Sequence, residues 1–385
     1  MFERGPRSHT FYEFFAGSGM VRAGLGGSWV CLFANDCDER KAAAYQENWG
    51  GGELLVGDVA DLTPSELPGQ PNLAWASFPC QDLSLAGMGA GLRGKQSGTF
   101  WPFWNLVREL NKEGRQPDTV VLENVCGALT SHGGKDFRTL VHALSVEGYR
   151  TGALVIDAAL FVPQSRPRLF IVGVRDDLDI DACLISQQPK SPFHTNGVVA
   201  AYKGLSRSDK DKWLWWNLPV PAPRISTFAS VIEHGVPWHS SEQTESLLAL
   251  MSPLHRAKVA AIKKTGRRTV GTIYKRTRPD ENGKRTQRAE VRFDEIAGCL
   301  RTPGGGSSRQ TIIVVHGNRV RSRLLSPREA ARLMGLPEEY VLPKNYNDAY
   351  RLMGDGVVVP VVSYLSRNLL EPFVQGAKSK IEHAA

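Results

Sequence analysis

The stretch Thr10-Phe-Tyr-Glu-Phe-Phe-Ala-Gly-Ser-Gly19 leads from an apolar run into two glycines. Glycine at the exit of a strand lets the backbone turn tightly against a ligand, which is typical of a doubly wound α/β sheet. Further along, short apolar runs alternate with stretches of helical spacing, as in a parallel sheet wound with helices. The expected strands are Thr10 to Phe15, Trp29 to Ala34, Glu53 to Val56, Leu73 to Ser77, Thr119 to Leu122, Ala153 to Asp157 and Leu169 to Val174. The expected helices are Val21 to Gly26, Glu39 to Asn48, Phe103 to Glu113 and Lys135 to Glu147.

The character of the chain changes after Arg175, where prolines cluster and tryptophans gather at positions 213, 215 and 216. The tryptophan cluster is expected to be the core of a small domain; the alternative is a platform for stacking bases. Helical spacing returns at Ser326-Pro327-Arg328-Glu329, which has the pattern of a capping box at the start of a helix. A last helix is expected from Val358 to Leu370. The expected division is a catalytic domain at 1–180, a second domain at 181–322, a segment at 323–375 that returns to the first domain, and a disordered tail at 376–385.

The basic charge of the chain is concentrated in one block. The net charge of the 385 residues is +8, and the block from Arg256 to Arg328 holds 19 Lys and Arg against five Asp and Glu, a net +14 that leaves −6 for the rest. A basic block beside an acidic body is the electrostatic footprint of a polyanion-binding face. The alternative is a solvated surface that is merely basic.

The sequence offers no sign of a membrane, secretion or metal-binding role. It has no run of about eighteen uncharged apolar residues and no charged-then-apolar leader, so neither a membrane span nor export is expected and the chain is expected in the cytoplasm. The six cysteines form no Cys-x-x-Cys pair and no metal-ligand spacing with histidine, so disulfides and structural zinc are not expected.

Residues that bear chemistry follow the expected strands. Asp36 comes after the second strand, where an acidic residue usually holds ribose hydroxyls, and Arg22 stands where a dinucleotide fingerprint has its third glycine. Cys80 follows a strand and a proline in Phe78-Pro79-Cys80-Gln81-Asp82-Leu83-Ser84, and Glu123 follows the strand Thr119 to Leu122. A thiolate can attack an electron-poor ring while an acid relieves the charge that develops on it.

Five separated motifs resemble, in residues and in order, those of the bacterial and phage DNA cytosine-5 methyltransferase family: Phe14-Phe15-Ala16-Gly17-Ser18-Gly19, Phe78-Pro79-Cys80-Gln81, Glu123-Asn124-Val125, Gln164-Ser165-Arg166-Pro167-Arg168 and Gly354-Asp355-Gly356-Val357. The resemblance implies a Rossmann-like S-adenosylmethionine-dependent methyltransferase fold with a second, smaller target recognition domain. It also implies methyl transfer to carbon 5 of a cytosine flipped out of a specific duplex DNA sequence, with S-adenosylhomocysteine as product and no metal. A monomer is expected, with a cognate restriction endonuclease as a separate partner.

The resemblance also assigns roles to individual residues. Cys80 is expected to add to carbon 6, Glu123 to share a proton with the ring nitrogen, and Arg168 to donate to the ring carbonyl. Arg166 is expected to hold a phosphate and neighbouring backbone, and an exchange of the two arginine roles is kept as the alternative. The expected cofactor contacts are Phe15, Ala16, Gly17, Ser18, Gly19, Asp36, Cys37, Asp58, Val59, Pro79, Thr99, Phe100, Asp355 and Val357. The expected DNA contacts are Gln81, Ser84, Arg93, Gln164, Arg267, Arg268 and Arg309, and the glycine-rich stretch Gly87 to Gly98 is expected to be a mobile lid.

Two positions depart from the family pattern: Asp355 replaces the usual asparagine, and Cys299-Leu300 replaces the usual Thr-Leu. Two rival functions are kept. One is an RNA cytosine methyltransferase, which the long basic block disfavours, and the other is a catalytically silent DNA-binding relative. Asp58 and Glu123 also have a plainer interpretation, as residues that cap the segments after their strands.

Overall fold

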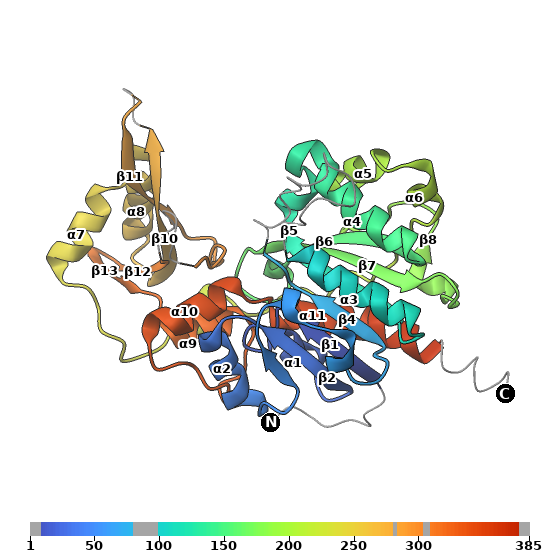
Figure 1. The fold of residues 1–385 in the computed structure, drawn as a ribbon. Coiled ribbons are helices and arrows are strands. Elements are labelled where there is room, and N and C mark those ends of the chain that lie inside the picture. The colour runs from blue at the N-terminus through green and yellow to red at the C-terminus, as the bar shows by residue number, and fades with distance from the viewer. Residues whose placement is uncertain (1–8, 80–98, 280–282, 303–308, 377–385) are drawn as a thin grey trace. The chain divides into compact units, whose positions relative to one another are not determined.

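A computed structural model describes residues 9–79, 99–279, 283–302 and 309–376 of the chain (Figure 1). The chain divides into two compact units, each with its own core. Unit 1 comprises Met1–Asp157, Pro167–Ala222 and Val361–Ala385, and unit 2 comprises Ala158–Arg166 and Pro223–Pro360.

Unit 1 is built on a seven-stranded sheet with the strand order β3-β2-β1-β4-β5-β7-β6 (Figure 1). Each expected strand is present: β1 (His9–Phe14), β2 (Trp29–Asp36), β3 (Leu54–Val56), β4 (Leu73–Ala76), β5 (Thr119–Val125), β6 (Tyr149–Asp157) and β7 (Pro167–Arg175). The central strands are near-continuous apolar runs, and every residue of β4 is buried. Such runs are typical of strands with both faces covered.

The expectation of an all-parallel sheet is wrong for one strand. Strands β1 to β5 run parallel, but β7 is antiparallel to both β5 and β6. A parallel return needs a crossover connection of about a dozen or more residues, usually with a helix. Only residues 158–166 join β6 to β7, which suits an antiparallel return.

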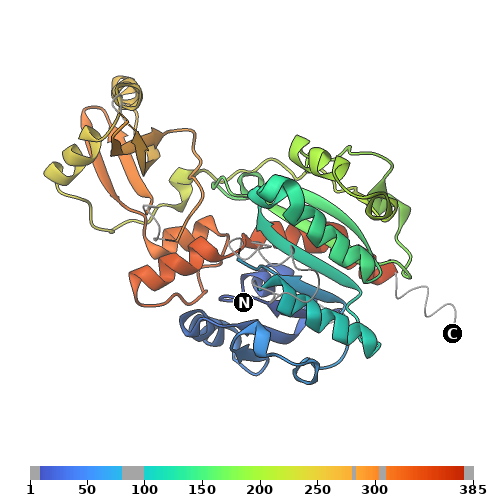
Figure 2. The ribbon, with the colours of Figure 1, turned by 45° about the horizontal axis from the view of Figure 1, so that its top comes forward.

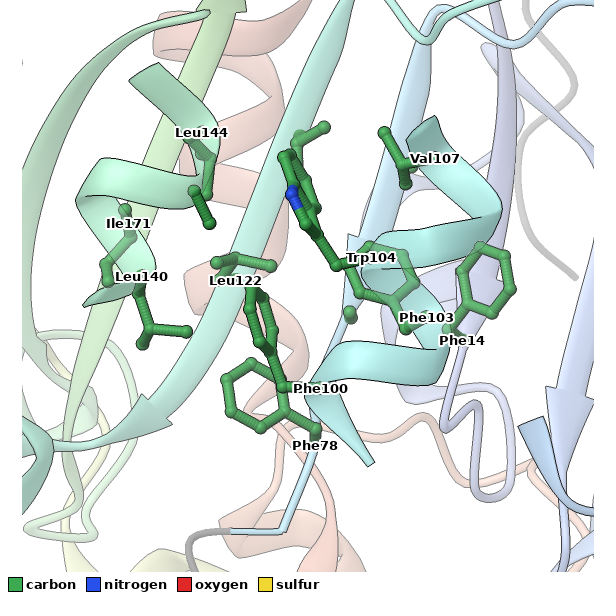
Figure 3. Close-up of a cluster of buried hydrophobic side chains, with 14 of the residues drawn as sticks. Phe14, Phe78, Phe100, Phe103, Trp104, Val107, Leu122, Leu140, Leu144 and Ile171 are labelled. Atoms are coloured by element: carbon green, nitrogen blue, oxygen red, sulfur yellow. The ribbon is translucent and has the colours of Figure 1, made fainter. Parts of the chain in front are cut away.

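Helices cover both faces of this sheet, and all four that the sequence predicts are present: α1 (Met20–Leu25), α2 (Glu39–Trp49), α3 (Phe100–Lys112) and α4 (Lys135–Val146). On one face, α3 and α4 contribute aromatic and branched side chains to a large core with the strands (Figure 3). The C-terminal run α11 (Val359–Leu365), which continues as a π-helical turn (Ser366–Leu370), lies along the opposite face (Figure 2).

The segment 176–222, which the sequence assigns mainly to the second domain, belongs to unit 1. It contains α5 (Asn196–Lys203), α6 (Arg207–Asp211) and the short strands β8 (Ile185–Ser186) and β9 (Trp215–Trp216). A Cβ on Gly152 of β6 would lie only 2.3 Å from the Leu214 carbonyl oxygen, so the segment runs directly against that strand. Trp215 and Trp216 are buried, at 8% and 0% exposure. The tryptophan cluster is therefore core, as expected, but it is the core of unit 1.

The C-terminal segment is shared between the units, although the sequence assigns all of 323–375 to the first domain. Residues up to Pro360 belong to unit 2, and those from Val361 belong to unit 1. Within unit 1, Trp29 Nε1 donates to Ser366 Oγ at 2.9 Å and Ser363 Oγ donates to the Gly24 carbonyl at 2.7 Å. These bonds attach the last helix to α1 and β2. The tail beyond residue 376 lies outside the described residues.

Among the described residues, one helical stretch, Tyr346–Gly376, is long and apolar enough to cross a membrane by length and composition alone. Its most apolar window is 67% buried inside the structure. A buried core helix passes the same test, so this stretch gives little support to a membrane span.

Unit 2 holds a four-stranded antiparallel sheet in the order β11-β10-β12-β13 (Figure 1). Its elements are α7 (Ser241–Ala249), α8 (Pro253–Thr265), β10 (Thr269–Pro279), β11 (Arg285–Arg292), β12 (Thr311–His316), β13 (Arg319–Leu324), α9 (Pro327–Leu333) and α10 (Tyr346–Asp355). Helices α7 and α8 bury one face of the sheet through Leu247, Val259, Ile273 and Ile313. The capping box predicted at Ser326 and Glu329 is confirmed at the start of α9.

Candidate active site

The carboxyl ends of the parallel strands of unit 1 meet at one edge of the sheet. Because β7 is antiparallel, its first residues reach the same edge. The Phe15–Gly19 loop follows β1, Asp36 ends β2, Asp58 follows β3, Pro79 follows β4, and Glu123 lies near the end of β5. Ligand sites of open α/β sheets form at such an edge.

The loop after β1 is held in a shape that most side chains cannot adopt. Phe15, Gly17 and Gly19 have φ angles of 58°, 58° and 77°. A Cβ on Gly19 would lie 2.3 Å from Trp49 Nε1, so only glycine fits under the indole. Phe15 keeps this strained conformation without being glycine, and such strain concentrates at functional sites.

Asp36 fastens this loop to the end of β2. Its Oδ2 accepts a hydrogen bond from the Gly17 backbone N–H at 2.8 Å, and its Oδ1 accepts one from the Asp38 N–H at 2.9 Å. A carboxylate oxygen can accept more than one hydrogen bond. The carboxylate can therefore fix the loop and still accept from ribose hydroxyls, as the sequence predicts.

Arg22, at the position of a third glycine, has a structural role in α1. Its guanidinium donates to Tyr45 Oη at 2.9 Å, pairs with Glu53, and lies 5.0 Å from the centre of the Trp49 ring. In a dinucleotide-binding loop, the third glycine allows the helix to pack closely on the strand, and a long side chain at this position does not. The loop therefore fits a ligand without a pyrophosphate.

The residues expected near adenine lie at the ends of β2 and β3. Asp58 is exposed, and its Oδ1 accepts from the Ala60 N–H at 2.9 Å, which is the capping role kept as the plainer interpretation. Cys37 lies at the surface. The pKa of its thiol is raised, mainly because the sulfur is partly buried and secondarily because of the negative charge of Asp36. Val59 is buried at 3% exposure.

The aromatic residues around the end of β4 form one packed group (Figure 3). Phe78 lies 6.4 Å from Phe15 and 5.4 Å from Phe100, measured between ring centres. Phe100 is only 2% exposed and stacks on Trp104, so it supports the group from inside the core. Thr99 is the residue before α3, and Pro79 is exposed at the edge. Cys80, Gln81, Ser84, Arg93 and the expected lid lie outside the described residues.

Glu123 and Arg168 form an ion pair at the same edge. Arg168 Nε lies 3.2 Å from Glu123 Oε1, and the two side chains are only 16% and 10% exposed. The backbone of Arg168 is paired with Val125, two residues beyond Glu123. Both residues therefore sit on hydrogen-bonded strands, which hold a site more firmly than loops do. The pair offers a carboxyl and a guanidinium side by side.

Two further side chains, Asn124 and Cys126, lie beside the ion pair and were not predicted as site residues. The Asn124 amide donates to the Phe78 carbonyl at 3.1 Å and so ties the exit of β5 to the exit of β4, two residues before Cys80. Burial raises the pKa of the Cys126 thiol, while the charge of Arg168 opposes the shift. The adjacency of Asn124 to Glu123 was the only available signal for Asn124.

Gln164 and Arg166, in unit 2, are both buried and both bind backbone groups. Gln164 is 0% exposed; its Nε2 donates to the Leu333 carbonyl at 2.8 Å, and its Oε1 accepts from the Leu300 N–H at 3.0 Å. Arg166 is 2% exposed and donates to the carbonyls of Leu300, Gly354 and Gly356 at 2.7–2.8 Å. The expected backbone contact of Arg166 is present. The expected DNA contact of Gln164 and phosphate contact of Arg166 do not fit this burial.

The remaining predicted residues of unit 2 lie on its surface or in its core. Asp355 is exposed and accepts a hydrogen bond from Thr302 Oγ1, whereas Val357 is 5% exposed. The Arg309 guanidinium lies 5.0 Å from the centre of the Tyr346 ring and also bonds Asn347. Arg267 and Arg268 are exposed between α8 and β10. Across the described residues, no group of three or more His, Cys, Asp or Glu is arranged to hold a metal.

A seven-stranded sheet in which β7 is antiparallel, with a glycine loop and an acidic residue at its carboxyl edge, is a Rossmann-like fold, and solved methyltransferase structures share it. The family model described as C-5 cytosine-specific DNA methylase matches residues 9–371, so the chain belongs to the DNA cytosine-5 methyltransferase family.

Relatives with curated names agree with this family. The chain is 27% identical to the Type II methyltransferase M.HpaII of Haemophilus parainfluenzae, over 94% of this chain and 89% of the relative. It is also 27% identical to M.HhaI of Haemophilus parahaemolyticus, with 93% of each chain covered, and 26% identical to a DNA-cytosine methyltransferase of Escherichia coli, over 97% of this chain and 80% of the relative.

Solved structures share the fold at lower identity. The S. pombe Dnmt2 methyltransferase superposes with a TM-score of 0.58 at 18% identity, covering 95% of this chain and 99% of that one. A putative DNA modification methyltransferase from an E. coli prophage gives 0.54 at 17% identity, covering 96% and 100%. At these low identities, the two comparisons show a shared fold and nothing more.

Proposed function

We propose that this protein transfers a methyl group from S-adenosylmethionine to carbon 5 of a cytosine that is flipped out of a specific duplex DNA sequence, through a covalent adduct with Cys80. The observation that carries the proposal is the Glu123–Arg168 ion pair. It lies at the sheet edge from which β4 leads through Pro79 to Cys80. A thiol, a carboxyl and a guanidinium in this order suit nucleophilic attack on a cytosine ring.

The Cys80 thiolate would form a bond to carbon 6 of the ring. Glu123 would share a proton with the ring nitrogen as negative charge develops, and Arg168 would donate to the ring carbonyl while orienting Glu123. S-adenosylmethionine, when bound, would supply the electrophilic methyl group to carbon 5, and S-adenosylhomocysteine would be the leaving group. Loss of the carbon 5 proton to a base would then restore the double bond and expel the thiolate.

The cofactor would lie at the ends of β1 to β3. The backbone of the Phe15–Gly19 loop, free of a pyrophosphate fingerprint, suits the methionine part, and Asp36 suits the ribose hydroxyls. Asp58 and Cys37 are proposed for the adenine edge, with Pro79 and Thr99 beside them. Asp355 and Val357 are proposed for the carboxylate end, with Asp355 held by Thr302.

DNA would be contacted by the basic block of unit 2, with Arg267, Arg268 and Arg309 among the phosphate contacts. The Type II names of the relatives support a place beside a restriction endonuclease. An RNA substrate and a silent relative are the rival functions. Transfer of labelled methyl from S-adenosylmethionine to duplex DNA, to tRNA or to neither separates all three.

The decisive experiment is covalent trapping on DNA that carries 5-fluorocytosine at the methylated site. After methyl transfer no removable proton remains at carbon 5, so the thiolate cannot leave and the adduct should survive denaturation. Cys80→Ser should bind DNA without trapping or methylating, because a hydroxyl has no accessible anion near neutral pH.

Cys126→Ser is the matched control, because it removes a thiol beside the same ion pair and should still trap. An adduct mapped by mass spectrometry to Cys126, or full activity in Cys80→Ser, would overturn the proposed chemistry.

A further inference from the structure

The Phe15–Gly19 loop rests on the indole of Trp49, the last residue of α2. Trp49 Nε1 donates a hydrogen bond to the Ser18 carbonyl at 3.2 Å. A Cβ on Gly19 would lie 2.3 Å from the same nitrogen and 2.7 Å from Cδ1 of the ring, so the backbone of the loop lies directly against the indole. Ala16 packs in the same apolar cluster as Trp49. None of the five sequence motifs includes Trp49.

The indole helps to fix the direction of one peptide unit in this loop. In the peptide that joins Ser18 to Gly19, the carbonyl accepts from Trp49, and the Gly19 N–H donates to the Ala16 carbonyl at 2.9 Å. Gly19 has a φ angle of 77°, and glycine adopts positive and negative φ angles about equally readily. The backbone of Gly19 therefore opposes a reversal of this peptide only weakly, and the two hydrogen bonds hold its direction.

The indole is itself held in place by polar side chains. The Arg22 guanidinium lies 5.0 Å from the centre of the Trp49 ring, donates to Tyr45 Oη at 2.9 Å and pairs with Glu53. Tyr45 is fully buried, and its hydroxyl donates to Glu53 Oε1 at 3.2 Å. A side chain that is locked by its neighbours in this way can position a binding loop accurately.

The direction of the Ser18–Gly19 peptide matters for a ligand that carries charges. Each peptide unit has a dipole of about 3.5 D. The methionine part of S-adenosylmethionine, which the loop suits, carries an ammonium and a carboxylate. Reversing the peptide would exchange the positions of an N–H and a carbonyl oxygen and so change the field on these charges. The adenosine part is assigned to Asp36 and Asp58, at the ends of other strands, and does not depend on this peptide.

We propose that Trp49 is a positioning residue for the cofactor: its indole N–H sets the direction of the Ser18–Gly19 peptide and thereby the affinity for the amino-acid part of S-adenosylmethionine. Arg22 supports this role by holding the indole. The inference rests on the proposed function and adds to it a residue that acts through the backbone of the loop.

The first test measures, by titration calorimetry, the binding of S-adenosylhomocysteine and of 5′-methylthioadenosine, which has the same adenosine and sulfur but no amino-acid part. Trp49→Phe keeps an aromatic ring and removes the N–H donor. S-adenosylhomocysteine should bind roughly fivefold more weakly, the size expected for the net loss of one hydrogen bond. The affinity for 5′-methylthioadenosine should not change.

Trp213→Phe is the matched control. Trp213 is also a half-buried tryptophan of unit 1, and its Nε1 has no hydrogen-bond partner among the described residues. This variant should bind both ligands as the wild type does. Equal losses for the two ligands in Trp49→Phe would show that the indole only supports the fold, and an unchanged affinity for S-adenosylhomocysteine would show that the bond has no effect; either result would overturn the proposal.

A second variant separates the N–H from the volume of the ring. Benzothienylalanine at position 49 keeps the shape of the indole but has a sulfur in place of the N–H. It should weaken S-adenosylhomocysteine binding as much as Trp49→Phe does. Wild-type affinity in this variant, beside a loss in Trp49→Phe, would assign the effect to ring volume and contradict the proposal.

Methyl transfer by the wild-type enzyme to duplex DNA is measured in parallel. An enzyme that shows the expected difference between the two ligands but does not methylate DNA would refute the proposed function and leave the role of Trp49 intact. An enzyme that methylates DNA, but whose Trp49→Phe variant shows no such difference, would refute the role of Trp49 alone.

Discussion

Glu13→Gln should stabilise this protein at high pH and leave its stability nearly unchanged at low pH. Glu13 lies on β1, just before the glycine loop, and is 1% exposed. No side chain among the described residues donates a hydrogen bond to either carboxyl oxygen, although the backbone N–H groups of Val21 and Arg22 favour the charged form. Burial raises the pKa of this carboxyl from 4.5 to about 8, while the charge of Arg22 opposes the shift.

The sign follows from proton binding. Between pH 4.5 and about 8, the folded protein keeps a proton on Glu13 that the unfolded chain has released. The folded state binds more protons in this window, so stability falls as the pH rises through it. At about 1.4 kcal/mol for each pH unit, the loss is on the order of 4 kcal/mol by pH 8.

The other groups that face Glu13 do not reverse this sign. Arg22 stays charged throughout the window, and its attraction is already part of the shift. Asp36 adds a small repulsion in the same direction as burial. Burial also raises the pKa of Cys31, to about 12, and of Tyr45, so both remain neutral in this window.

Urea unfolding of the cofactor-free protein at pH 5, 7 and 9 measures the effect. The free energy of unfolding should fall between pH 5 and 9 less steeply in Glu13→Gln than in the wild type, and the variant should be the more stable protein at pH 9. Glu47→Gln, an exposed glutamate of α2, is the control and should follow the wild type. A Glu13→Gln protein that is less stable than the wild type at pH 9 would refute the reasoning.

Three further substitutions test the site. Glu123→Gln should lower turnover roughly a hundredfold with little change in DNA affinity, because the carboxyl acts as charge develops on the ring; a loss confined to binding would contradict this. Arg166→Gln should lower the free energy of unfolding by roughly 3 kcal/mol, because it leaves buried carbonyls unpaired, whereas the exposed Arg40→Gln should cost under about 0.5 kcal/mol. Asp355→Asn should keep full activity, because an amide oxygen can still accept from Thr302; a large loss in methylation rate would mean that the carboxylate charge itself is needed.

Most of the fold of unit 1 was predictable because buried strands are apolar along their whole length and the helices show clear periodicity. The direction of β7 was harder to predict, since the apolar run Leu169 to Val174 has the pattern of a strand whichever way it runs. The short connection at 158–166 was the available cue. The membership of 176–222 was missed because a proline-rich composition suggests a boundary but gives no sign that Trp216 packs against β6.

The candidate site also combines residues that the sequence predicts with residues whose surroundings it does not predict. Asp36 and Glu123 were predictable because a polar residue at the end of a buried strand has to lie at the sheet edge. The burial of Gln164 and Arg166 was not predictable, because residue type does not tell which way a side chain faces. Their hydrogen-bond partners, the backbone groups of Leu300, Leu333 and Gly354, are far away in sequence, and no local sequence pattern predicts these bonds.

The burial of Gln164 and Arg166 has a consequence for building chimeric enzymes. An exchange of recognition regions between relatives would naturally be cut after the Gln-x-Arg-x-Arg motif, near the boundary at 181–322 that the sequence suggests. Such a graft would leave both side chains in the recipient but would bring in the donor's version of the Leu300 backbone, which both of them bind. The structure instead favours transplanting Ala158–Arg166 together with Pro223–Pro360, so that the motif itself is split and Arg168 stays with Glu123.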